Sequence, residues 1–568
     1  MWGAEMKRKI PIGISDFQTI IEDNYYYVDK SLFIQEVLDL GARALLLPRP
    51  RRFGKTLNLS MLRYFFEKTD QDHSHLFKNL TIWQQGDMYT SKQGRYPVIY
   101  LTFKDVKSDR WDFCYDMFGN LIAKEYGRHR YLLTSDLLGE DEKTKFTAIL
   151  NCLASEFNYA SSIKELSEYL HRYHNEKVII LIDEYDTPVH CGYLDGFYDD
   201  VIGFIRILLG SALKDNTSME KGVLTGILRV SKESVFSGLN NLEVFSLLSP
   251  EFSDHFGLMD NEVEELLNYY EIGFNIVEVK DWYNGYVFGG QTMYNPWSIL
   301  NYSSKWSQGF RPYWVNTSSN DLVKSIITRS GTEVKEDLEQ LILGNSITKI
   351  VDDNIVFGEI ESNADTVWSF LLFCGYLKAV SMEYRNKRLY VELRIPNMEV
   401  EYLYEEIIIS WFSQSIYDRQ LHRMLRGLTS GDLELFESIF RDFIEKTFSY
   451  FDASGKEPEK VYHAFILGLL VSLQETYEVK SNQESGYGRY DVMLIPRDPR
   501  NKGIVFEFKK VNKQKNETLT EAVDRALEQI EQKKYAQTLT ERGVSDILLL
   551  GIAFQGKEVL LKSREYVG

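Results

Sequence analysis

Pro48-Arg-Pro-Arg-Arg-Phe-Gly-Lys-Thr56 is the stretch of this sequence that decides the fold of its N-terminal part. It follows a short apolar run and precedes residues 57–66, in which apolar side chains recur with a helical period. A loop between a strand and a helix that ends in Gly-Lys-Thr is typical of a phosphate-binding loop. Gly54 lets the backbone approach a phosphate, Lys55 reaches the β- and γ-phosphates, and the Thr56 hydroxyl binds Mg²⁺ at the helix N-terminus.

The loop departs from the general pattern at one position. That pattern has glycine at position 49, whereas this chain has Arg49 between two prolines. Gly-Lys-Thr is common by chance, so the stretch taken alone is better explained by an ordinary turn before a helix.

A second motif lies further along the chain. Val178–Ile182 is a continuous apolar run, as expected for a parallel strand buried on both faces, and it ends in Asp183-Glu184-Tyr185-Asp186. Asp183 would hold the Mg²⁺ shell, and Glu184 would orient or polarise the attacking water. A strand end capped by solvated acids is the alternative for this segment in isolation. The loop and the strand together indicate a nucleotide-binding domain.

Residues 7–235 alternate short apolar runs with helical patterns, which predicts an α/β fold: a P-loop NTPase domain with a doubly wound parallel sheet. The predicted strands are Ala44–Leu47, Val98–Phe103, Val178–Ile182 and Gly222–Leu228, and the predicted helices include Ser31–Leu40 and Ile163–Tyr173. Thr225 and Arg229, at the end of the last strand, could sense a γ-phosphate. A buried strand with a capping hydroxyl explains them equally well.

Three further regions follow. Residues 236–330 are aromatic-rich and mostly helical in pattern, and we interpret them as a helical lid on the nucleotide domain. Residues 331–440 combine helical patterns with a hairpin-like piece, Leu389–Pro396, which suggests a winged-helix-like connector. Residues 441–568 form a C-terminal α/β domain. No long repeat or Pro-rich linker separates these regions, so we expect the domains to pack against each other.

The C-terminal region contains a second group of chemically active residues. Tyr490–Ile495 and Ile504–Lys509 have strand patterns joined by turn residues. Alternation along the second strand places Glu507 and Lys509 on one face, and a hairpin brings Asp491 beside Glu507. Two carboxylates around one or two Mg²⁺ ions form a phosphodiester-cleaving site, in which the metal polarises the phosphate and helps to deprotonate water. Lys509 would stabilise the developing charge or position the nucleophile.

The segments that follow fit this interpretation. A helix with a buried apolar stripe carries Gln529 and Lys533 as an i, i+4 pair, and Ile547–Phe554 returns as a strand, which gives a ββαβ order. Upstream, Val461–Leu473 is an apolar helical pattern that carries His463, most simply a core or capping residue. A surface strand with an ordinary Glu/Lys pair is the alternative to the cleaving site.

Composition limits the possible functions. The chain has 568 residues, 44% of them hydrophobic, which is ample for several cores. Its net charge of −18 argues against sequence-independent coating of nucleic acid, although a nucleic-acid enzyme with local basic patches remains compatible. The cysteines have no paired spacing, so neither a disulfide framework nor a zinc site is expected; they are Cys114, Cys152, Cys191 and Cys374.

The sequence shows no apolar run near the roughly 18 residues of a membrane helix, and no signal-peptide core at its start. We therefore expect no membrane partner and a cytoplasmic location.

Together, these motifs resemble a bacterial and archaeal family, the AAA-ATPase-like proteins that carry a C-terminal PD-(D/E)XK nuclease-superfamily domain. The resemblance covers nearly the whole chain and rests on Ile10–Phe17, Tyr27–Ser31, Arg49–Ser60, Leu181–Asp186, Trp282–Tyr286, Gly488–Asp491 and Glu507–Lys509. In this family the phosphate loop has the form Arg-Pro-Arg-Arg-Phe-Gly-Lys-Thr, so Arg49 departs from the general pattern but not from that of the family.

The resemblance implies a role for each matching residue. The ATP-binding residues would be Arg52, Phe53, Gly54, Lys55, Thr56 and Asp183, with Glu184 as the catalytic partner in the Walker B pair. The nuclease core would be Asp491, Glu507 and Lys509, with Gln529 as a helix-borne auxiliary. The Mg²⁺ ligands would be Thr56 and Asp183 at the first site and Asp491 and Glu507 at the second.

We therefore expect a protein that binds and hydrolyses ATP and whose P-loop domain regulates a Mg²⁺-dependent C-terminal nuclease acting on DNA, or less readily RNA. The alternative is a nucleotide-dependent switch or nucleic-acid-binding module whose nuclease fold does not cleave; convergence of Asp491 and Glu507 distinguishes the two. A pure ATPase, such as a remodeller, would need an arginine finger from a neighbouring subunit, for which Arg206 and Arg229 are candidates.

Overall fold

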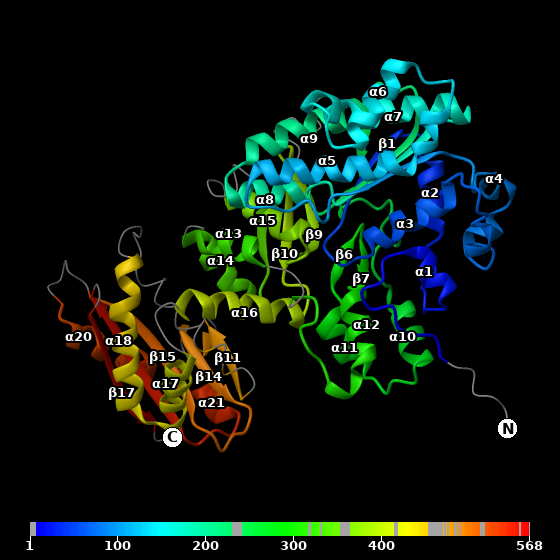
Figure 1. The fold of residues 1–568 in the computed structure, drawn as a ribbon. Helices are drawn as coiled ribbons and strands as arrows, with labels where there is room; N and C mark the ends of the chain where they lie inside the picture. Colours follow the sequence, from blue (N-terminus) through cyan, green and yellow to red (C-terminus); the bar gives the residue numbers. More distant parts are fainter. Residues whose placement is uncertain are drawn as a thin grey trace, which may run out of the picture. The chain divides into compact units, whose positions relative to one another are not determined.

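The computed structural model divides the chain into two compact units (Figure 1). The first comprises Met1–Val323 and Thr348–Val400, and the second Lys324–Ile347 and Glu401–Gly568. The structure describes residues 7–229, 241–315, 320–329, 332–342, 344–352, 364–413, 418–451, 470, 473, 476–481, 484–485, 488–489, 491–511, 517–555 and 558–566.

Five parallel strands form the central sheet of the first unit, in the order β2-β3-β4-β1-β5. They are β1 Ala44–Pro48, β2 Val98–Thr102, β3 Val178–Asp183, β4 Met219–Gly226 and β5 Leu242–Val244. The four predicted strands are confirmed, although β4 begins and ends earlier than the sequence suggested. Every residue of β1 and β3 is buried, as their apolar runs require.

The strand order positions the candidate nucleotide site. Only β4 lies between β1 and β3, so the loop after β1 and the acids after β3 emerge at the same edge of the sheet. The short strand β5 was not predicted, because its three residues, Leu-Glu-Val, carry no distinct pattern.

Helices complete the α/β unit, and α5, α7 and α9 pack side by side (Figure 1). The helices before the lid region are α1 Phe17–Glu22, α2 Leu32–Asp39, α3 Lys55–Phe66, α4 Asp87–Thr90, α5 Trp111–Arg128, α6 Glu140–Leu150, α7 Glu156–His174, α8 Thr187–Asp195 and α9 Tyr198–Leu213. The two predicted helices are confirmed as α2 and α7. Helix α7 begins before the predicted residue because Ser155 caps it by accepting a hydrogen bond from Asn158 N.

Residues 258–304 build an aromatic core around three helices and a small hairpin. The helices are α10 Asp260–Tyr269, α11 Ile276–Tyr283 and α12 Pro296–Ser304, and the hairpin strands are β6 Tyr286–Phe288 and β7 Gln291–Met293. The mostly helical pattern is confirmed, whereas the hairpin was not predicted. Tyr283, Tyr294 and Tyr302 are buried among aliphatic side chains, so the aromatic cluster forms a core rather than a ligand cage.

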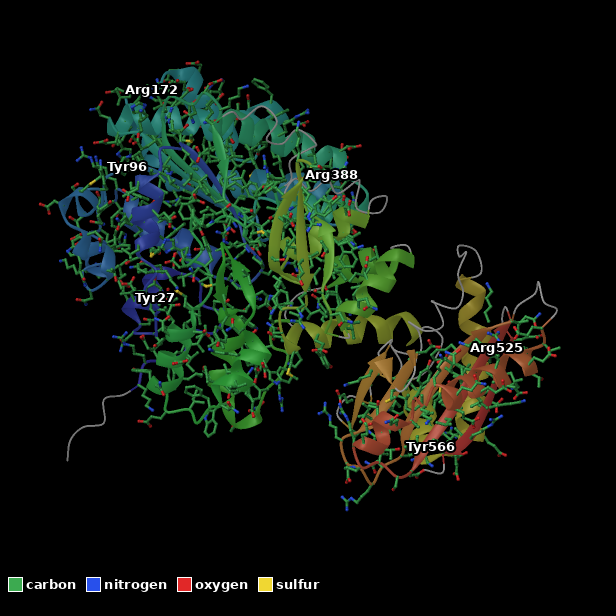
Figure 2. The ribbon with its side chains drawn as sticks, turned by 180° about the vertical axis from the view of Figure 1, so that it is seen from behind. Tyr27, Tyr96, Arg172, Arg388, Arg525 and Tyr566 are labelled. Carbon is green, nitrogen blue, oxygen red and sulfur yellow. The ribbon has the colours of Figure 1, made fainter. Side chains whose placement is uncertain are left out.

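A three-stranded sheet in the order β8-β10-β9 follows in the chain. Its strands are β8 Ile347–Ile350, β9 Lys378–Arg385 and β10 Arg388–Arg394, and α15 Ala364–Phe373 precedes the β9–β10 hairpin. Figure 2 marks Arg388 at the start of β10. The predicted hairpin-like piece is therefore confirmed as β10 and the end of its hairpin.

The second unit contains a mixed five-stranded sheet in the order β11-β14-β15-β16-β17. Its strands are β11 Tyr477–Ser481, β14 Val492–Pro496, β15 Gly503–Lys510, β16 Ile547–Gln555 and β17 Glu558–Tyr566. Strands β15 and β16 are parallel and joined through α20 Leu519–Gln532 and α21 Gln537–Glu541, whereas the other neighbours are antiparallel. The predicted ββαβ order is confirmed.

The second unit also holds further helices, wholly or in part, and two tiny strands that precede β14. They are α13 Asp321–Arg329, α14 Thr332–Ile342, α16 Met398–Ser413, α17 Asp418–Ser430 and α18 Leu433–Phe451, with β12 Glu484–Ser485 paired to β13 Gly488–Arg489. The predicted helix Val461–Leu473 and His463 lie outside the described residues, apart from positions 470 and 473.

Candidate functional sites in the two units

The loop between β1 and α3 has the backbone shape of a phosphate cradle. Gly54 has a φ of +86° and Arg52 a φ of +68°, in the left-handed region that glycine adopts most easily. Within the described chain, the backbone N–H groups of residues 52–56 donate to no protein acceptor. Lys55 is buried, and its Nζ donates to the carbonyl oxygens of Arg49 and Pro50, both at 2.9 Å. The loop thus curls around the ammonium and leaves its N–H groups for an anion.

Thr56 and the first acid of the second motif meet directly. Thr56 Oγ1 donates to Asp183 Oδ2 at 2.7 Å, and Thr225 Oγ1 donates to Asp183 Oδ1 at 2.6 Å. Asp183 is fully buried, and this burial raises its pKa. Mg²⁺ takes oxygen ligands, so the Thr56 hydroxyl and the Asp183 carboxylate suit it. Thr225, considered from sequence as a γ-phosphate sensor or a capping residue, is placed here as a hydrogen-bond donor to Asp183.

Glu184 turns away from the strand immediately after Asp183. Its φ is +50°, which is uncommon for a residue other than glycine. Glu184 Oε2 accepts a hydrogen bond from Thr187 Oγ1 at 3.3 Å, and its side chain lines the cavity in front of the loop. The unusual backbone conformation therefore accompanies a carboxylate aimed at the candidate site.

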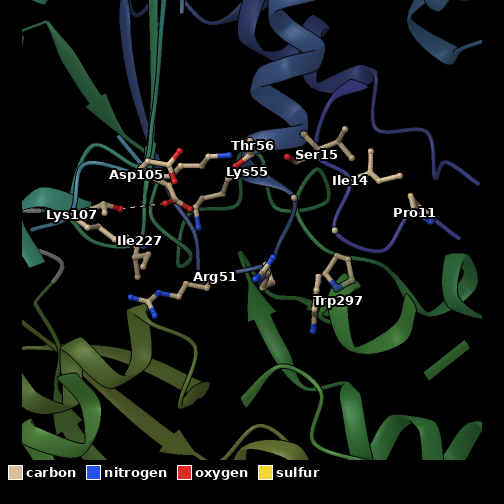
Figure 3. Close-up of a pocket in the computed structure, with 18 of the residues that line it drawn as sticks. Pro11, Ile14, Ser15, Arg51, Lys55, Thr56, Asp105, Lys107, Ile227 and Trp297 are labelled. Atoms are coloured by element: carbon tan, nitrogen blue, oxygen red, sulfur yellow. Dashed lines mark hydrogen bonds between the residues drawn. The ribbon is translucent and has the colours of Figure 1, made fainter. Parts of the chain in front are cut away.

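A cavity of about 670 Å³ opens in front of this loop, a size typical of small-ligand sites. Its lining is both apolar and charged. Its apolar lining residues include Pro11, Ile14, Ile20, Leu57, Trp297 and Leu300, and its charged ones include Arg51, Lys55, Lys104, Asp105, Lys107 and Glu184. Figure 3 shows Pro11, Ile14 and Trp297 on one side of Lys55, and Arg51, Lys107 and Ile227 on the other. The cavity can therefore accept both an apolar ring and phosphates.

The remaining predicted loop residues play unequal parts. Arg52 lines the cavity and stacks on Trp297, with its guanidinium carbon 4.2 Å from the ring centroid. Phe53 instead is buried against Tyr286 and Phe288 and anchors the loop from behind.

Arg49, which replaces the expected glycine, is a buried clamp. Its Nη1 donates to the carbonyl oxygens of Pro48 at 2.8 Å and Phe245 at 2.7 Å, and its Nη2 to that of Phe252 at 3.3 Å. The guanidinium also lies 5.1 Å from the ring centroid of Phe256. Burial lowers the pKa of Arg49 to about 9. Position 49 therefore fastens the loop to residues 245–256 and does not face a phosphate.

Restoring the general pattern with Arg49→Gly should destabilise the protein. The substitution leaves three carbonyl oxygens without their donor and opens a void beside Phe256, for a cost of about 3 kcal/mol in the free energy of unfolding. Urea unfolding followed by tryptophan fluorescence measures it. Arg52→Gly is the matched control, because glycine suits the left-handed φ there and the side chain is exposed. Equal stability of Arg49→Gly and the wild type would contradict the clamp.

Donors from residues 257–314 hold two further carbonyl groups of the loop. Trp314 Nε1 donates to Arg51 O at 3.2 Å, Asn295 Nδ2 donates to the same oxygen at 3.4 Å, and Gly257 N donates to Phe53 O at 3.2 Å. With its carbonyl groups engaged, the loop presents its N–H side to the cavity. These donors could not be predicted from the sequence, because contacts between residues so far apart along the chain follow no local period.

Trp314 also connects the loop to a buried acid at the start of α16. Trp314 N donates to Glu399 Oε1, and Ser298 Oγ donates to Glu399 Oε2 at 2.7 Å. Glu399 is fully buried, and burial raises its pKa from 4.5 to about 7. The first residues of α16 belong to the first unit and the rest to the second, so this helix carries the chain from one unit into the other.

Glu399→Gln should change the pH dependence of stability. The folded protein binds the Glu399 proton more tightly than the unfolded chain, so wild-type stability falls as pH rises from about 4.5 to about 7, by about 3 kcal/mol from this group. Glutamine can keep both contacts without a charge, because its oxygen accepts from Trp314 N and its amide group can donate to Ser298 Oγ. The variant minus wild-type difference in unfolding free energy should therefore grow over this window and level off above pH 7, measured by urea unfolding at several pH values. A difference independent of pH would contradict the assignment.

The second unit brings its three predicted core residues together. The register pairs Val492 with Phe506, so Asp491 falls beside Glu507, and Asp491 Oδ2 accepts a hydrogen bond from Phe508 N at 2.7 Å. Lys509 Nζ donates to Glu507 Oε1 at 2.6 Å. The predicted alternation is confirmed, because Glu507 and Lys509 share the face that α20 covers.

Helix α20 contributes Gln529, whose Nε2 donates to Glu507 Oε1 and to Tyr535 Oη. Lys533, the other member of the predicted pair, is exposed and has no bond to these groups in the described structure. Tyr535 was not predicted, since a buried tyrosine in this position has the sequence pattern of a core residue.

Glu507 is a buried carboxylate with one oxygen that has no partner in the described structure. It is 1% exposed, and its Oε2 has no hydrogen-bond partner among the described residues. Burial first, and the charge of Asp491 second, raise the pKa of Glu507 to about 7. A divalent cation held by Asp491 and Glu507 would offset both effects by favouring the charged carboxylate, and the unpartnered oxygen fits such an ion.

Glu36, Asp254 and His255 also place ligand-type atoms within 4.8 Å of one another. His255 Nε2 lies 2.7 Å from Glu36 Oε2, and Glu36 Oε1 accepts a hydrogen bond from Phe252 N. These bonds link α2 to residues 252–255, which explains the cluster without an ion.

Comparisons with known proteins agree with this division. Residues 11–236 match the family model described as Predicted AAA-ATPase, and residues 457–564 match that of the PD-(D/E)XK nuclease superfamily. A protein of Azotobacter chroococcum mcd 1, named an uncharacterized protein in the vnfD 5'region, is 29% identical to this chain over an alignment of 565 residues. The alignment covers 96% of each chain. No helix in the described part of the chain is both long and apolar enough to cross a membrane. The chain therefore joins an N-terminal domain of the predicted AAA-ATPase family to a C-terminal domain of the PD-(D/E)XK nuclease superfamily.

Proposed function

We propose that the first unit binds and hydrolyses ATP. The cavity supports this most directly, because it has free backbone N–H groups, Lys55 and the Thr56–Asp183 pair, together with apolar side chains. Thr56 and Asp183 would hold Mg²⁺, which supplies charge neutralisation for the phosphates. Glu184 would orient the attacking water from its place on the cavity wall.

We further propose that the second unit cleaves nucleic-acid phosphodiesters, DNA in preference to RNA. Asp491 and Glu507 would hold Mg²⁺, which would supply Lewis-acid polarisation of the phosphate. Lys509 neutralises charge beside them, and Gln529 fixes the Glu507 carboxylate by a hydrogen bond. The convergence of Asp491 and Glu507 supports cleavage over the alternative of a module that binds without cutting.

Part of the positive charge on the described surface of this unit is already engaged in ion pairs. Several of its basic side chains are paired with acids, as Arg525 with Glu517 and Lys562 with Asp524. Figure 2 marks Arg525 on α20. A phosphate backbone would displace such pairs or approach beside exposed lysines such as Lys510 and Lys533, which form no ion pair in the described structure, so binding should weaken steeply with salt.

In this proposal the first unit regulates the second. Residues 7–235 form the ATPase domain, 236–330 a helical lid, 331–440 a winged-helix-like connector and 441–568 the nuclease-like domain, in a cytoplasmic setting. Helix α16 provides a path for this regulation, because the chain passes through it from the first unit into the second. Glu399 at its start accepts a hydrogen bond from Trp314 N, and Trp314 Nε1 in turn donates to Arg51 O in the phosphate loop.

The decisive experiment measures metal- and ATP-dependent cleavage of single- and double-stranded DNA and RNA by the full chain, with Lys509→Ala as control. Cleavage that requires Mg²⁺, responds to ATP and disappears in Lys509→Ala supports the proposal. Tight binding of nucleic acid without cleavage would identify the non-cleaving switch instead. Cleavage unaffected by ATP would refute the regulation alone.

A further inference from the structure

Three basic side chains line the nucleotide cavity. Arg51 comes from the phosphate loop, and Lys104 and Lys107 come from the segment after β2 (Figure 3). In the part of the chain that the structure describes, none of the three forms an ion pair. By contrast, Arg110, only a few residues further on, is paired with Asp112. Asp105 and Glu184 line the cavity as well, but within the described residues none of the three cations is held in an ion pair there, so each is available to a polyanion.

The charges of Arg51 and Lys107 both influence the same side chain on the cavity wall, His190. Burial first lowers the pKa of His190, and the charges of Arg51 and Lys107 lower it further, against the opposite effects of Asp186 and Glu184. His190 itself lines the cavity. The two cations therefore lie near His190, on the wall of the cavity that Glu184 and the phosphate loop also line.

Hydrolysis of ATP needs positive charge beside the outermost phosphate. Water attacks the γ-phosphorus, the bond to the bridging oxygen breaks, and its electron pair remains on ADP, while the proton of the water passes to the released phosphate. Negative charge on the γ-phosphoryl oxygens and the bridging oxygen must be stabilised during this step, and P-loop enzymes take the final cation from the same chain or from a neighbour.

The candidates for a donor to a neighbouring subunit lie elsewhere. Arg206 is exposed on α9, and neither it nor Arg229 lines the cavity. Arg51 and Lys107, by contrast, line the cavity itself.

We propose that Arg51 and Lys107 are catalytic residues that act on the γ-phosphate within the same chain, so that one protomer hydrolyses ATP without a finger from a partner. The proposal deepens the ATPase function proposed above and rests on it. It predicts that Arg51 and Lys107 contribute to the rate of hydrolysis much more than to the binding of ATP, because their charges face the group on which charge develops.

The test compares full-length wild type, Arg51→Ala, Lys107→Ala and the charge-preserving Lys107→Arg. ATP affinity is measured with a fluorescent analogue, and hydrolysis by single-turnover release of phosphate. We expect the two alanine variants to lose about 10²-fold in rate with affinity changed by less than about threefold, and Lys107→Arg to recover part of the rate. Arg110→Ala is the matched control, since it removes a nearby positive charge outside the cavity. The wild-type rate per protomer should not depend on protein concentration.

Each other outcome refutes the proposal. Wild-type rates in both alanine variants would show that these cations do not act on the γ-phosphate. A rate per protomer that rises with concentration and is lost in Arg206→Ala or Arg229→Ala would assign the finger to a neighbour. ATP binding without hydrolysis by the wild type would overturn this inference but leave nucleotide binding intact, whereas no ATP binding would overturn both.

Discussion

Glu507→Gln and Lys509→Ala should each lower Mg²⁺-dependent cleavage of nucleic acid by about 10³-fold or more. Glutamine keeps the size of Glu507 and its contact region with Gln529, but it removes the negative charge and replaces one carboxylate oxygen with an amide nitrogen. Because Glu507 Oε2 is buried and unpartnered in the described structure, the amide nitrogen can take its place while the remaining oxygen still accepts from Lys509 and Gln529, although the ion pair with Lys509 loses its negative partner. Cleavage of an end-labelled duplex over time, in Mg²⁺ and in Mn²⁺, measures the effect.

Lys510→Ala provides the control for the lysine variant. It removes the same type of side chain one position along β15, where alternation turns it to the opposite face, and the residue is exposed. Its cleavage rate should stay within about threefold of the wild type, and ATP affinity should be unchanged in all three variants. Cleavage that persists in Glu507→Gln would move the chemistry to other residues.

The elements that the sequence predicted well are those in which local pattern and burial agree. Strands β1 and β3 are continuous apolar runs in the sequence and are wholly buried in the sheet, so the two nucleotide motifs could be located to the residue. The alternation in β15 likewise placed Glu507 and Lys509 on one face before any contact was known. A strand period determines which side of a sheet a residue faces, and the structure follows that period here.

The contacts that the sequence could not supply are those between distant segments. Arg49 looked like a defect in a phosphate loop, yet its guanidinium binds the carbonyl groups of Phe245 and Phe252, nearly two hundred residues away. Trp314 and Glu399 support the same loop from still greater separations. Such bonds join a side chain to a backbone group, so neither composition nor periodicity at either end records them.

The clamp also changes how the loop can work. In the general pattern a glycine at this position lets the backbone wrap the β-phosphate. Here the position is occupied by Arg49, whose buried guanidinium binds the carbonyl groups of Pro48, Phe245 and Phe252. The N–H groups of residues 52–56 must then do most of the cradling, together with Lys55. The binding energy for a triphosphate should consequently depend heavily on one ammonium group.

Lys55→Ala should therefore raise the dissociation constant for ATP by about 10³-fold, which corresponds to about 4 kcal/mol. The Lys55 ammonium is buried and satisfied by two carbonyl oxygens at 2.9 Å, so it is already positioned at the mouth of the cradle and can pass to a phosphate without leaving the loop. Alanine removes the charge and leaves those carbonyl groups facing the phosphate, where they repel it. Isothermal titration with ATP in Mg²⁺ measures the loss, and an unchanged affinity would show that the loop does not bind the nucleotide.

Lys68→Ala is the matched control, because this exposed lysine follows the other end of the same helix.

Lys55→Ala and Lys509→Ala together also test the regulation of the second unit by the first. If the nucleotide controls the second unit, cleavage by Lys55→Ala should no longer respond to ATP, whereas Lys509→Ala should still bind ATP with wild-type affinity. A response to ATP that survives in Lys55→Ala would mean that the nucleotide acts somewhere other than at this loop.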